Sequence, residues 1–315
     1  MSNLVVTHSP HIHSGESTRR IMLDVIIALI PSLIASVVFF GPRALLLTGV
    51  TILTAVISEA VSRKIMNRDP KSVLDLTAVI TALLLALSLP ASMPLWMAAT
   101  GAIVAIVVVK QFFGGVGQNF VNPAIAGRLM LTFSYPIAMS AAWTQAFDYR
   151  IADAVTTATP LGLLAEGAAL PSLRDLFLGI HAGSMGETSI LALLLGAGYL
   201  LIRRVISPVI PFTFIGAAML LTALAGQPVP EHLFSGSLIF AAFFMATDYV
   251  TSPITFTGKI IFGVGCGFIT AVIRLFAALP EGVSFAIIIM NILVPHIERL
   301  TLPKAFGSKK GDADE

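Results

Sequence analysis

The stretch IMLDVIIALIPSLIASVVFF (residues 21–40) contains a single charged residue, Asp24, in twenty positions. A helix that crosses the hydrocarbon core of a bilayer needs about 20 mainly apolar residues. The stretch therefore predicts a membrane-spanning helix. Nine further runs of the same kind follow it, at approximately 43–62, 73–89, 94–113, 122–140, 187–202, 207–226, 233–252, 258–279 and 283–300.

The composition agrees with a membrane protein. Hydrophobic residues make up 56% of the 315 residues and charged residues 11%, whereas soluble domains have about 25% charged residues. The apolar runs lack the strict alternation of barrel strands, and helices satisfy their own backbone hydrogen bonds in lipid. We therefore expect an all-α integral membrane protein with about ten transmembrane helices, surrounded by membrane lipid. The net charge of +2 gives no indication of a nucleic-acid partner.

The distribution of lysine and arginine predicts the orientation, because these residues gather in cytoplasmic loops. With ten helices, the cation-rich connections all fall on one side of the membrane. They contain Arg19, Arg20, Arg63, Lys64, Arg68, Lys71, Arg203, Arg204, Lys259, Arg299, Lys304, Lys309 and Lys310. We therefore expect the N-terminal arm (1–20) and the C-terminal tail (301–315) in the cytoplasm. The long connection 141–186 is then expected on the outer face.

Two stretches of the chain resemble each other: GAIVAIVVVKQFFGGVGQNF (101–120) and GCGFITAVIRLFAALPEGVSF (265–285). In both, a glycine precedes a cation by nine residues and a phenylalanine follows two residues later. The match predicts two five-helix repeats, 21–140 and 187–300, which must be inverted because five is odd. Inverted repeats commonly form a binding site between them. The alternative is a chance match between helices rich in glycine and phenylalanine.

Several polar residues fall within or beside the apolar runs. An ionisable group at membrane depth is costly and marks a candidate functional site. Asn122 and Arg128 either form a cationic corner for a phosphate or flavin, or cap a helix beside a snorkelling arginine. Asp248 and Thr251 either bind a cofactor or an ion, or cap a helix at the interface. These four residues are a tentative flavin or ion environment, and Asp75 occupies a similar position near the third run.

Other residues have simpler interpretations. The segment GVGCG (263–267) favours close helix packing, with Cys266 as a core thiol. One cysteine excludes an internal disulfide and a cysteine cluster held by this chain alone. His8, His11 and His13 lack paired ligands elsewhere, so we expect no metal site and interpret the arm as a docking segment.

The segment DAVTTATPLG (153–162) places three threonines within four positions of the long hydrophilic connection. Pro160 biases the preceding residue, Thr159, toward an extended backbone. An extended residue can present its hydroxyl clear of the chain. The residues alone favour a hydroxyl-rich solvated turn.

The same segment resembles the flavinylation signature Asp-x-x-Ser/Thr-x-Ala-Thr. Asp153, Thr156, Ala158 and Thr159 match the signature, and Thr157 stands where the family often has glycine. The resemblance implies that FMN is joined through its phosphate to Thr159, with Thr157 as a competing hydroxyl. It names no catalytic residue in this chain.

The likeness covers nearly the whole chain. SPHIHSGESTRRIMLDVI, GGVGQNFVNPAIAGRLML, FMATDYVTSP and PEGVSFAIIIMNILVPHIER occur in the order expected for D subunits of the Rnf complex, an ion-translocating ferredoxin:NAD oxidoreductase. The B subunit of the sodium-translocating NADH:quinone reductase is similar, but its amino-terminal region is usually longer.

The resemblance implies a membrane flavoprotein that couples electron transfer to Na⁺ or H⁺ translocation in a bacterial or archaeal cytoplasmic membrane. It implies covalent FMN installed by a flavin transferase, and a noncovalent riboflavin in some members. The implied partners are other membrane and peripheral subunits, including iron–sulfur subunits and a second subunit with covalent FMN. The chain is then not a complete enzyme alone. The alternatives are an autonomous secondary transporter with inverted repeats and a purely scaffolding subunit.

Overall fold

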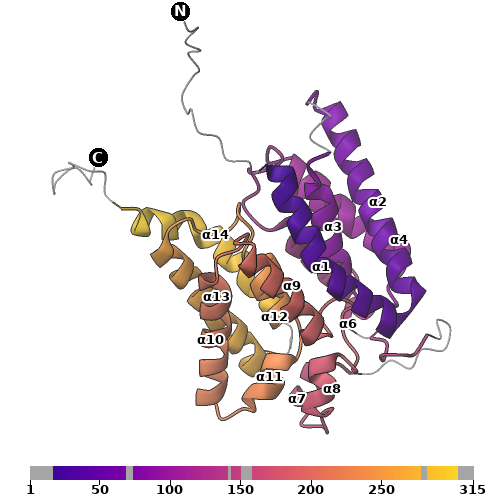
Figure 1. Cartoon of the computed structure of the whole chain (residues 1–315), viewed down its shortest axis with the longest axis vertical. Helices are drawn as coiled ribbons and strands as arrows, with labels where there is room; N and C mark the ends of the chain where they lie inside the picture. The colour runs from indigo at the N-terminus through magenta and orange to yellow at the C-terminus, as the bar shows by residue number, and fades with distance from the viewer. Residues whose placement is uncertain (1–16, 69–73, 141–142, 150–157, 278–281, 304–315) are drawn as a thin grey trace, which may run out of the picture.

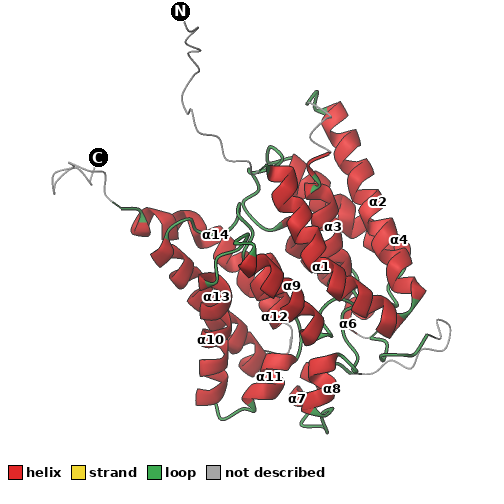
Figure 2. Cartoon of the chain, viewed as in Figure 1, coloured by secondary structure: helices red, strands yellow, loops and turns green. Residues whose placement is uncertain are grey.

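The computed structural model describes residues 17–68, 74–140, 143–149, 158–277 and 282–303. All regular structure in these ranges is helical, and none of the described residues forms a strand (Figure 2). The prediction of an all-α fold is confirmed.

The helices form an N-terminal and a C-terminal group, which stand side by side in Figure 1. The first group consists of α1 (Thr18–Phe40), α2 (Pro42–Ile65), α3 (Thr77–Leu87), α4 (Leu95–Ile103) with its π-helical continuation η2 (Val104–Gln111), α5 (Pro123–Ser134) and α6 (Pro136–Ser140). The connection holds two short helices, α7 (Pro160–Ala165) and α8 (Leu173–Leu178). The second group consists of α9 (Ile190–Ile202), α10 (Val209–Leu224), α11 (Val229–Phe234), α12 (Leu238–Phe240), the π-helical η3 (Ala241–Met245), α13 (Phe256–Phe276) and α14 (Val283–Thr301).

Helical structure lies within every one of the ten predicted runs, but the helices differ in length. Among the described residues, four are long and apolar enough to cross a membrane, namely α1, α2, α13 and α14. Shorter apolar helices occupy four other runs, namely α3, α4 with η2, α9 and α10. The runs 122–140 and 233–252 are broken, the first before Pro136 and the second around Gly236. The chain thus has membrane-spanning helices, while the count of ten and the inverted repeats stay predictions.

Glycines permit close contact between helices at two places. A Cβ on Gly196 of α9 would collide with the carbonyl oxygen of Ala28 on α1, so these two backbones touch across the two groups. On α13, Gly263 and Gly267 face the backbone of α10. Cys266 is free and fully buried. The expected packing role of GVGCG and the core position of Cys266 are therefore confirmed.

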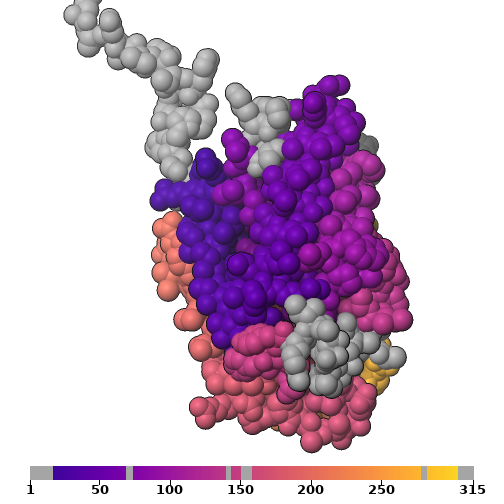
Figure 3. Space-filling view, turned by 90° about the vertical axis from the view of Figure 1, so that its right-hand side faces the viewer, coloured from indigo at the N-terminus to yellow at the C-terminus, as the bar shows by residue number. Residues whose placement is uncertain are grey.

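The end of the long connection folds back into the protein. Residues 181–190 are buried, and this segment pairs with the end of α3. Met185 N–H donates to Leu89 O at 3.0 Å and Gly186 N–H to Leu87 O at 2.7 Å. α7 and α8 lie at the lower end of the bundle in Figure 1, and the space-filling view places this part of the chain below the surface formed by α1 and α2 (Figure 3).

Candidate functional site

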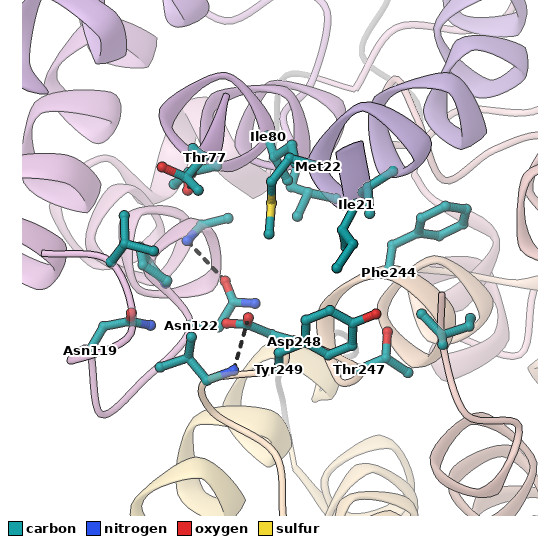
Figure 4. A pocket seen from close by; sticks show the side chains of 18 of the residues that line it. Ile21, Met22, Thr77, Ile80, Asn119, Asn122, Phe244, Thr247, Asp248 and Tyr249 are labelled. Carbon is teal, nitrogen blue, oxygen red and sulfur yellow. Dashed lines mark hydrogen bonds between the residues drawn. The ribbon is translucent and has the colours of Figure 1, made fainter. Parts of the chain in front are cut away.

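A cavity of about 130 Å³ lies where the two helix groups meet (Figure 4). We call it the central cavity. Its walls come from α1, α3, η2 and the stretch before α5 on one side, and from α9, η3 and the residues after η3 on the other. Most of the lining is apolar. The polar side chains among it are Thr77, Thr81, Lys110, Asn119, Asn122, Thr247, Asp248 and Tyr249.

Asp248 lies in the turn directly after η3, where it is half-buried. Its Oδ1 accepts from Val250 N–H at 3.3 Å (Figure 4) and its Oδ2 from the hydroxyl of Thr251 at 3.2 Å. Asp248 and Thr251, two of the four tentative site residues, are therefore in direct contact, and their binding of a flavin or an ion stays a prediction. The hydroxyl of Thr247 instead donates to Phe243 O, one helical turn earlier, at 2.7 Å. The carboxylate keeps lone pairs for a further ligand because each oxygen accepts only one of these bonds.

Asn122 joins the two helix groups. Its Oδ1 caps α5 by accepting from Ala124 N–H at 3.0 Å, and its Nδ2 donates to Met245 O at 3.1 Å. Its backbone N–H donates to Oδ1 of Asn291 at 3.2 Å. Asn291 Nδ2 in turn donates to Thr251 O at 2.8 Å. The helix-capping interpretation of Asn122 is therefore correct, and its amide holds the wall of the cavity in place.

Beside the cavity, Lys110 forms a buried ion pair that was not predicted from the sequence. Lys110 Nζ lies 3.1 Å from Glu59 Oε2 and 2.7 Å from the hydroxyl of Thr77. Glu59 also accepts from Gln111 Nε2 at 2.9 Å and from Arg63 Nε at 3.3 Å. A buried carboxylate needs such partners to offset its lost hydration. The sequence did contain a signal for this ion pair, because Glu59 is an acidic residue inside the predicted membrane-spanning run 43–62.

Arg128 lies apart from this site. It is 2% exposed on α5, and its guanidinium lies 3.5 Å from Oε2 of Glu187, which is 3% exposed. The snorkelling interpretation of Arg128 is therefore wrong, because its charge is paired inside the protein. Neither Arg128 nor Asp75 lines the central cavity. Of the four tentative site residues, the structure brings together Asn122, Asp248 and Thr251 only.

Thr159 occupies a separate place, at the start of α7. Its backbone is extended, with φ −67° and ψ 157°, as Pro160 predicted. Its side-chain oxygen accepts from Gly162 N–H at 3.2 Å, which leaves the hydroxyl proton available. Thr159 is half-buried and Ala158 is exposed. The signature residues Asp153 and Thr156, with Thr157, lie outside the described residues.

The described residues contain no group of three or more His, Cys, Asp or Glu side chains arranged to hold a metal ion. Apart from Arg128 and Asp75, the expected site residues that the structure describes fall at two places, the polar groups of the central cavity and the hydroxyl of Thr159 at the start of α7. They belong to different regions of the fold.

Comparison with known proteins gives matches over nearly the full length. The model of the NQR2, RnfD, RnfE family matches residues 5–307. The D subunit of the Na(+)-translocating ferredoxin:NAD(+) oxidoreductase complex of Acetobacterium woodii is 44% identical over 312 residues, which cover 98% of this chain and 96% of the relative. The D subunit of the proton-translocating ferredoxin:NAD(+) oxidoreductase complex of Clostridium ljungdahlii is 39% identical over 323 residues, with 97% and 96% coverage. The D subunit of the ion-translocating oxidoreductase complex of Stutzerimonas stutzeri is 38% identical, with 92% of each chain covered.

Proposed function

The chain belongs to the NQR2, RnfD, RnfE family, and from this premise we propose that it works as the D subunit of an ion-translocating ferredoxin:NAD oxidoreductase complex. The observation that carries the proposal is the similarity to D subunits over almost the whole length of both chains. As part of an oxidoreductase it depends on partners, because it has one cysteine and so no cysteine cluster of its own. Iron–sulfur subunits and a second subunit with covalent FMN would supply the missing electron carriers.

Within the complex, Thr159 would carry covalent FMN. The position supports this role in two ways. The hydroxyl is partly accessible next to an exposed Ala158, as a flavin transferase requires, and α7 is anchored by the buried side chains of Pro160 and Leu161. When bound, FMN supplies electron transfer in single or paired steps, while the protein supplies placement and electrostatics. The chain's own contribution is to hold the attachment oxygen in one position through Gly162 N–H.

The central cavity would form part of the ion path. The cavity, of about 130 Å³, has room for water-sized groups beside Asp248, and a Na⁺ ion or H⁺ with water would bind there. Asp248 would offer its carboxylate to the ion, and Lys110 would repel a cation unless Glu59 neutralised it.

Coupling requires that electron transfer change the affinity of this site for the ion or its access to it. Moving one elementary charge against about 100 mV costs about 2.3 kcal/mol. Two hydrogen bonds, from Asn122 to Asn291 and from Asn291 to Thr251, connect the start of α5 with α14 and with the residues after η3. They therefore link the two helix groups at the wall of the central cavity. A movement of one group relative to the other would therefore reach Asp248 through Thr251.

The predicted orientation and repeats are part of the proposal. α1 begins in the upper half of Figure 1 whereas α7 lies at the lower end, which agrees with a cytoplasmic N-terminal arm and an outer-face flavin.

The two proposed repeats make similar glycine contacts. Gly101 faces Leu131 of α5, and its counterpart Gly265 faces Met290 of α14. A Cβ on either glycine would lie 2.5 Å from that side chain. The similar contacts support two related halves.

The experiment for the flavin uses the full chain produced in cells that contain the flavin transferase. After denaturing electrophoresis, in-gel fluorescence should stay with the chain and disappear in Thr159→Val, whereas Thr157→Val should retain it. Mass spectrometry of the peptide that includes residue 159 should locate the FMN phosphoester. A wild-type chain without attached flavin in an active complex would overturn the assignment. Ion transport by the purified chain without any redox partner would favour an autonomous transporter instead.

A further inference from the structure

The end of the long connection is buried, although its residues 181–189 form no helix. We call these residues the fold-back segment. The hydroxyl of Ser32 on α1 donates to Gly186 O at 2.7 Å. A Cβ on Gly186 would collide with the side chain of Leu87 on α3, so the segment touches this helix at a position where only glycine fits. The segment therefore lies between helices and not on the surface of the protein.

The fold-back segment and the central cavity lie at opposite ends of the same helices. On α3, Thr77 lines the cavity and Leu87 contacts the segment. On α9, Leu200 lines the cavity, and Ile190 directly follows the segment. Each of these pairs is ten residues apart, which corresponds to about 15 Å along a helix. A path that leads from the cavity along these helices would therefore meet the fold-back segment.

The position in the whole molecule agrees with this arrangement. α8, which precedes the segment, lies at the lower end of the bundle in Figure 1, whereas α1 begins in its upper half. Ile21 and Met22 in the first turn of α1 line the central cavity, and so do Val205 and Ile206 after α9. The cavity thus lies toward the end that is predicted to face the cytoplasm, and the segment lies toward the outer face.

The two ends of the fold-back segment are close together. Gly179, which ends α8, has φ +101°, a conformation that favours glycine. A Cβ on Gly179 would lie 2.9 Å from the backbone N and Cα of Ser189, which caps α9. Hinges are commonly a few residues at the ends of helices or in loops. Gly179 and Ser189 are therefore the two positions about which the segment can turn as one unit.

Several polar atoms of the segment are buried without a partner. The hydroxyl oxygens of Ser184 and Thr188 and Oε2 of Glu187 have no hydrogen-bond partner among the described residues. Ser184 and Thr188 are fully buried, and Glu187 is 3% exposed. Glu187 is held by its ion pair with Arg128 on α5, at 3.5 Å. Buried polar groups without partners are unfavourable, and these atoms would gain partners in water if the segment moved outward.

We propose that the fold-back segment is the outer gate of the ion path, and that the ion pair between Glu187 and Arg128 holds it closed. The inference rests on the proposed ion path and orientation, and it goes further by naming the element that separates the central cavity from the outer face. Alternating access exposes a transport site to one side of the membrane at a time. The structure then corresponds to a site that faces the cytoplasm, and electron transfer would open the segment.

The first test measures whether the segment opens during turnover. Ser184→Cys is introduced into the complete complex, which is purified in lipid nanodiscs and treated with a charged thiol reagent. The reaction is run with and without reduced ferredoxin and NAD⁺, and mass spectrometry of this chain gives the labelled fraction of each cysteine peptide. We expect the labelling rate of residue 184 to rise severalfold during turnover.

The matched control for this test is Thr270→Cys on α13. Thr270 is also fully buried, and its hydroxyl oxygen also lacks a hydrogen-bond partner among the described residues. It lies outside the fold-back segment, so we expect the same slow labelling with and without the substrates. An equal rise at residues 184 and 270 would indicate a general loosening of the protein and would contradict a gate.

A second variant tests the ion pair. Glu187→Asp keeps the charge but shortens the side chain by one methylene group, which weakens a contact that already measures 3.5 Å. In Ser184→Cys/Glu187→Asp, labelling without substrates should rise toward the rate that Ser184→Cys shows during turnover. Glu166→Asp in the same background is the control, because Glu166 is exposed, and it should leave the resting rate unchanged.

The outcomes separate the gate from the proposed function. Equal labelling of Ser184→Cys with and without substrates, in a complex that transports ions in proteoliposomes, would overturn the gate and leave the ion path intact. Failure of the wild-type complex to transport ions would instead overturn the proposed function. If Ser184→Cys does not accumulate, Thr188→Cys is measured against the same outcomes, because Thr188 is fully buried in the same segment.

Discussion

The side chain of Asn291 binds the backbone of Asn122, although 169 positions separate them in the chain. Asn291 Oδ1 accepts from Asn122 N–H, and its Nδ2 donates to Thr251 O. The two groups of helices are thus joined by one buried amide next to the central cavity. An amide can do this because it carries a donor and an acceptor on the same planar group.

Replacement of Asn291 should weaken this junction. Asn291→Leu leaves the N–H of Asn122 and the carbonyl of Thr251 without these partners, and a buried unsatisfied polar group costs about 1–3 kcal/mol. We expect a lower unfolding temperature in detergent. Cys266, the only cysteine, is fully buried, so a thiol-reactive dye reports unfolding directly. The exposed Gln227→Ala serves as the control, and equal unfolding temperatures for Asn291→Leu and the wild type would contradict the prediction.

The contact between α1 and α9 should depend on Gly196. A Cβ at this position collides with Ala28 O, so Gly196→Ala must push the two helix groups apart. Gly198→Ala on the same helix is a matched control, since nothing lies within 4 Å of the added methyl group. Overpacking of this kind costs about 1–3 kcal/mol. The dye assay should show a clear destabilisation for position 196 and none for position 198, and the same result at both positions would disprove the role of the contact.

The charge balance around Lys110 should be essential for stability. Glu59→Gln removes the negative charge between Lys110 and Arg63, and breaking a buried ion pair costs about 3–5 kcal/mol. The double variant Glu59→Gln/Lys110→Met removes one charge of each sign and should recover part of the loss. Both are compared with the exposed Glu166→Gln in the dye assay. If Glu59→Gln were as stable as the double variant, the ion pair between Glu59 and Lys110 would contribute no net electrostatic stabilisation.

Asp248 should be required for transport and dispensable for folding. Asn is nearly isosteric and can still accept one of the two bonds from Val250 N–H and Thr251, so Asp248→Asn should unfold close to the wild-type temperature. Loss of the negative charge should reduce ion uptake into inverted vesicles containing the whole complex by roughly tenfold or more, which corresponds to about 1.4 kcal/mol. Thr222→Val is the control, because Thr222 is buried on α10 away from the cavity lining and its hydroxyl donates to Ala218 O at 2.9 Å. Normal coupled uptake by Asp248→Asn would exclude this carboxylate from the ion path.

Local patterns in the chain were sufficient for several of these features. Long apolar runs such as 21–40 predict helices because only helices or closed barrels satisfy the backbone in lipid. The Asn-Pro pair at residues 122–123 indicates a helix start, and Pro160 indicates the extended backbone of Thr159. Each of these depends on neighbours within a few residues, which a sequence displays directly. Near full-length similarity added the family.

The contacts between distant segments could be established only by the tertiary structure. Nothing in the sequence around Arg128 shows that its partner is Glu187, or that Asn291 joins Asn122 to Thr251. The buried polar atoms of His232, Ser235 and Ser237 that lack a hydrogen-bond partner among the described residues are likewise recognised only in the folded chain. The physical reason is that burial and pairing are properties of three-dimensional proximity. Hydropathy along the chain determines which segments enter the membrane, whereas helix packing decides which charges and hydrogen-bonding groups meet there.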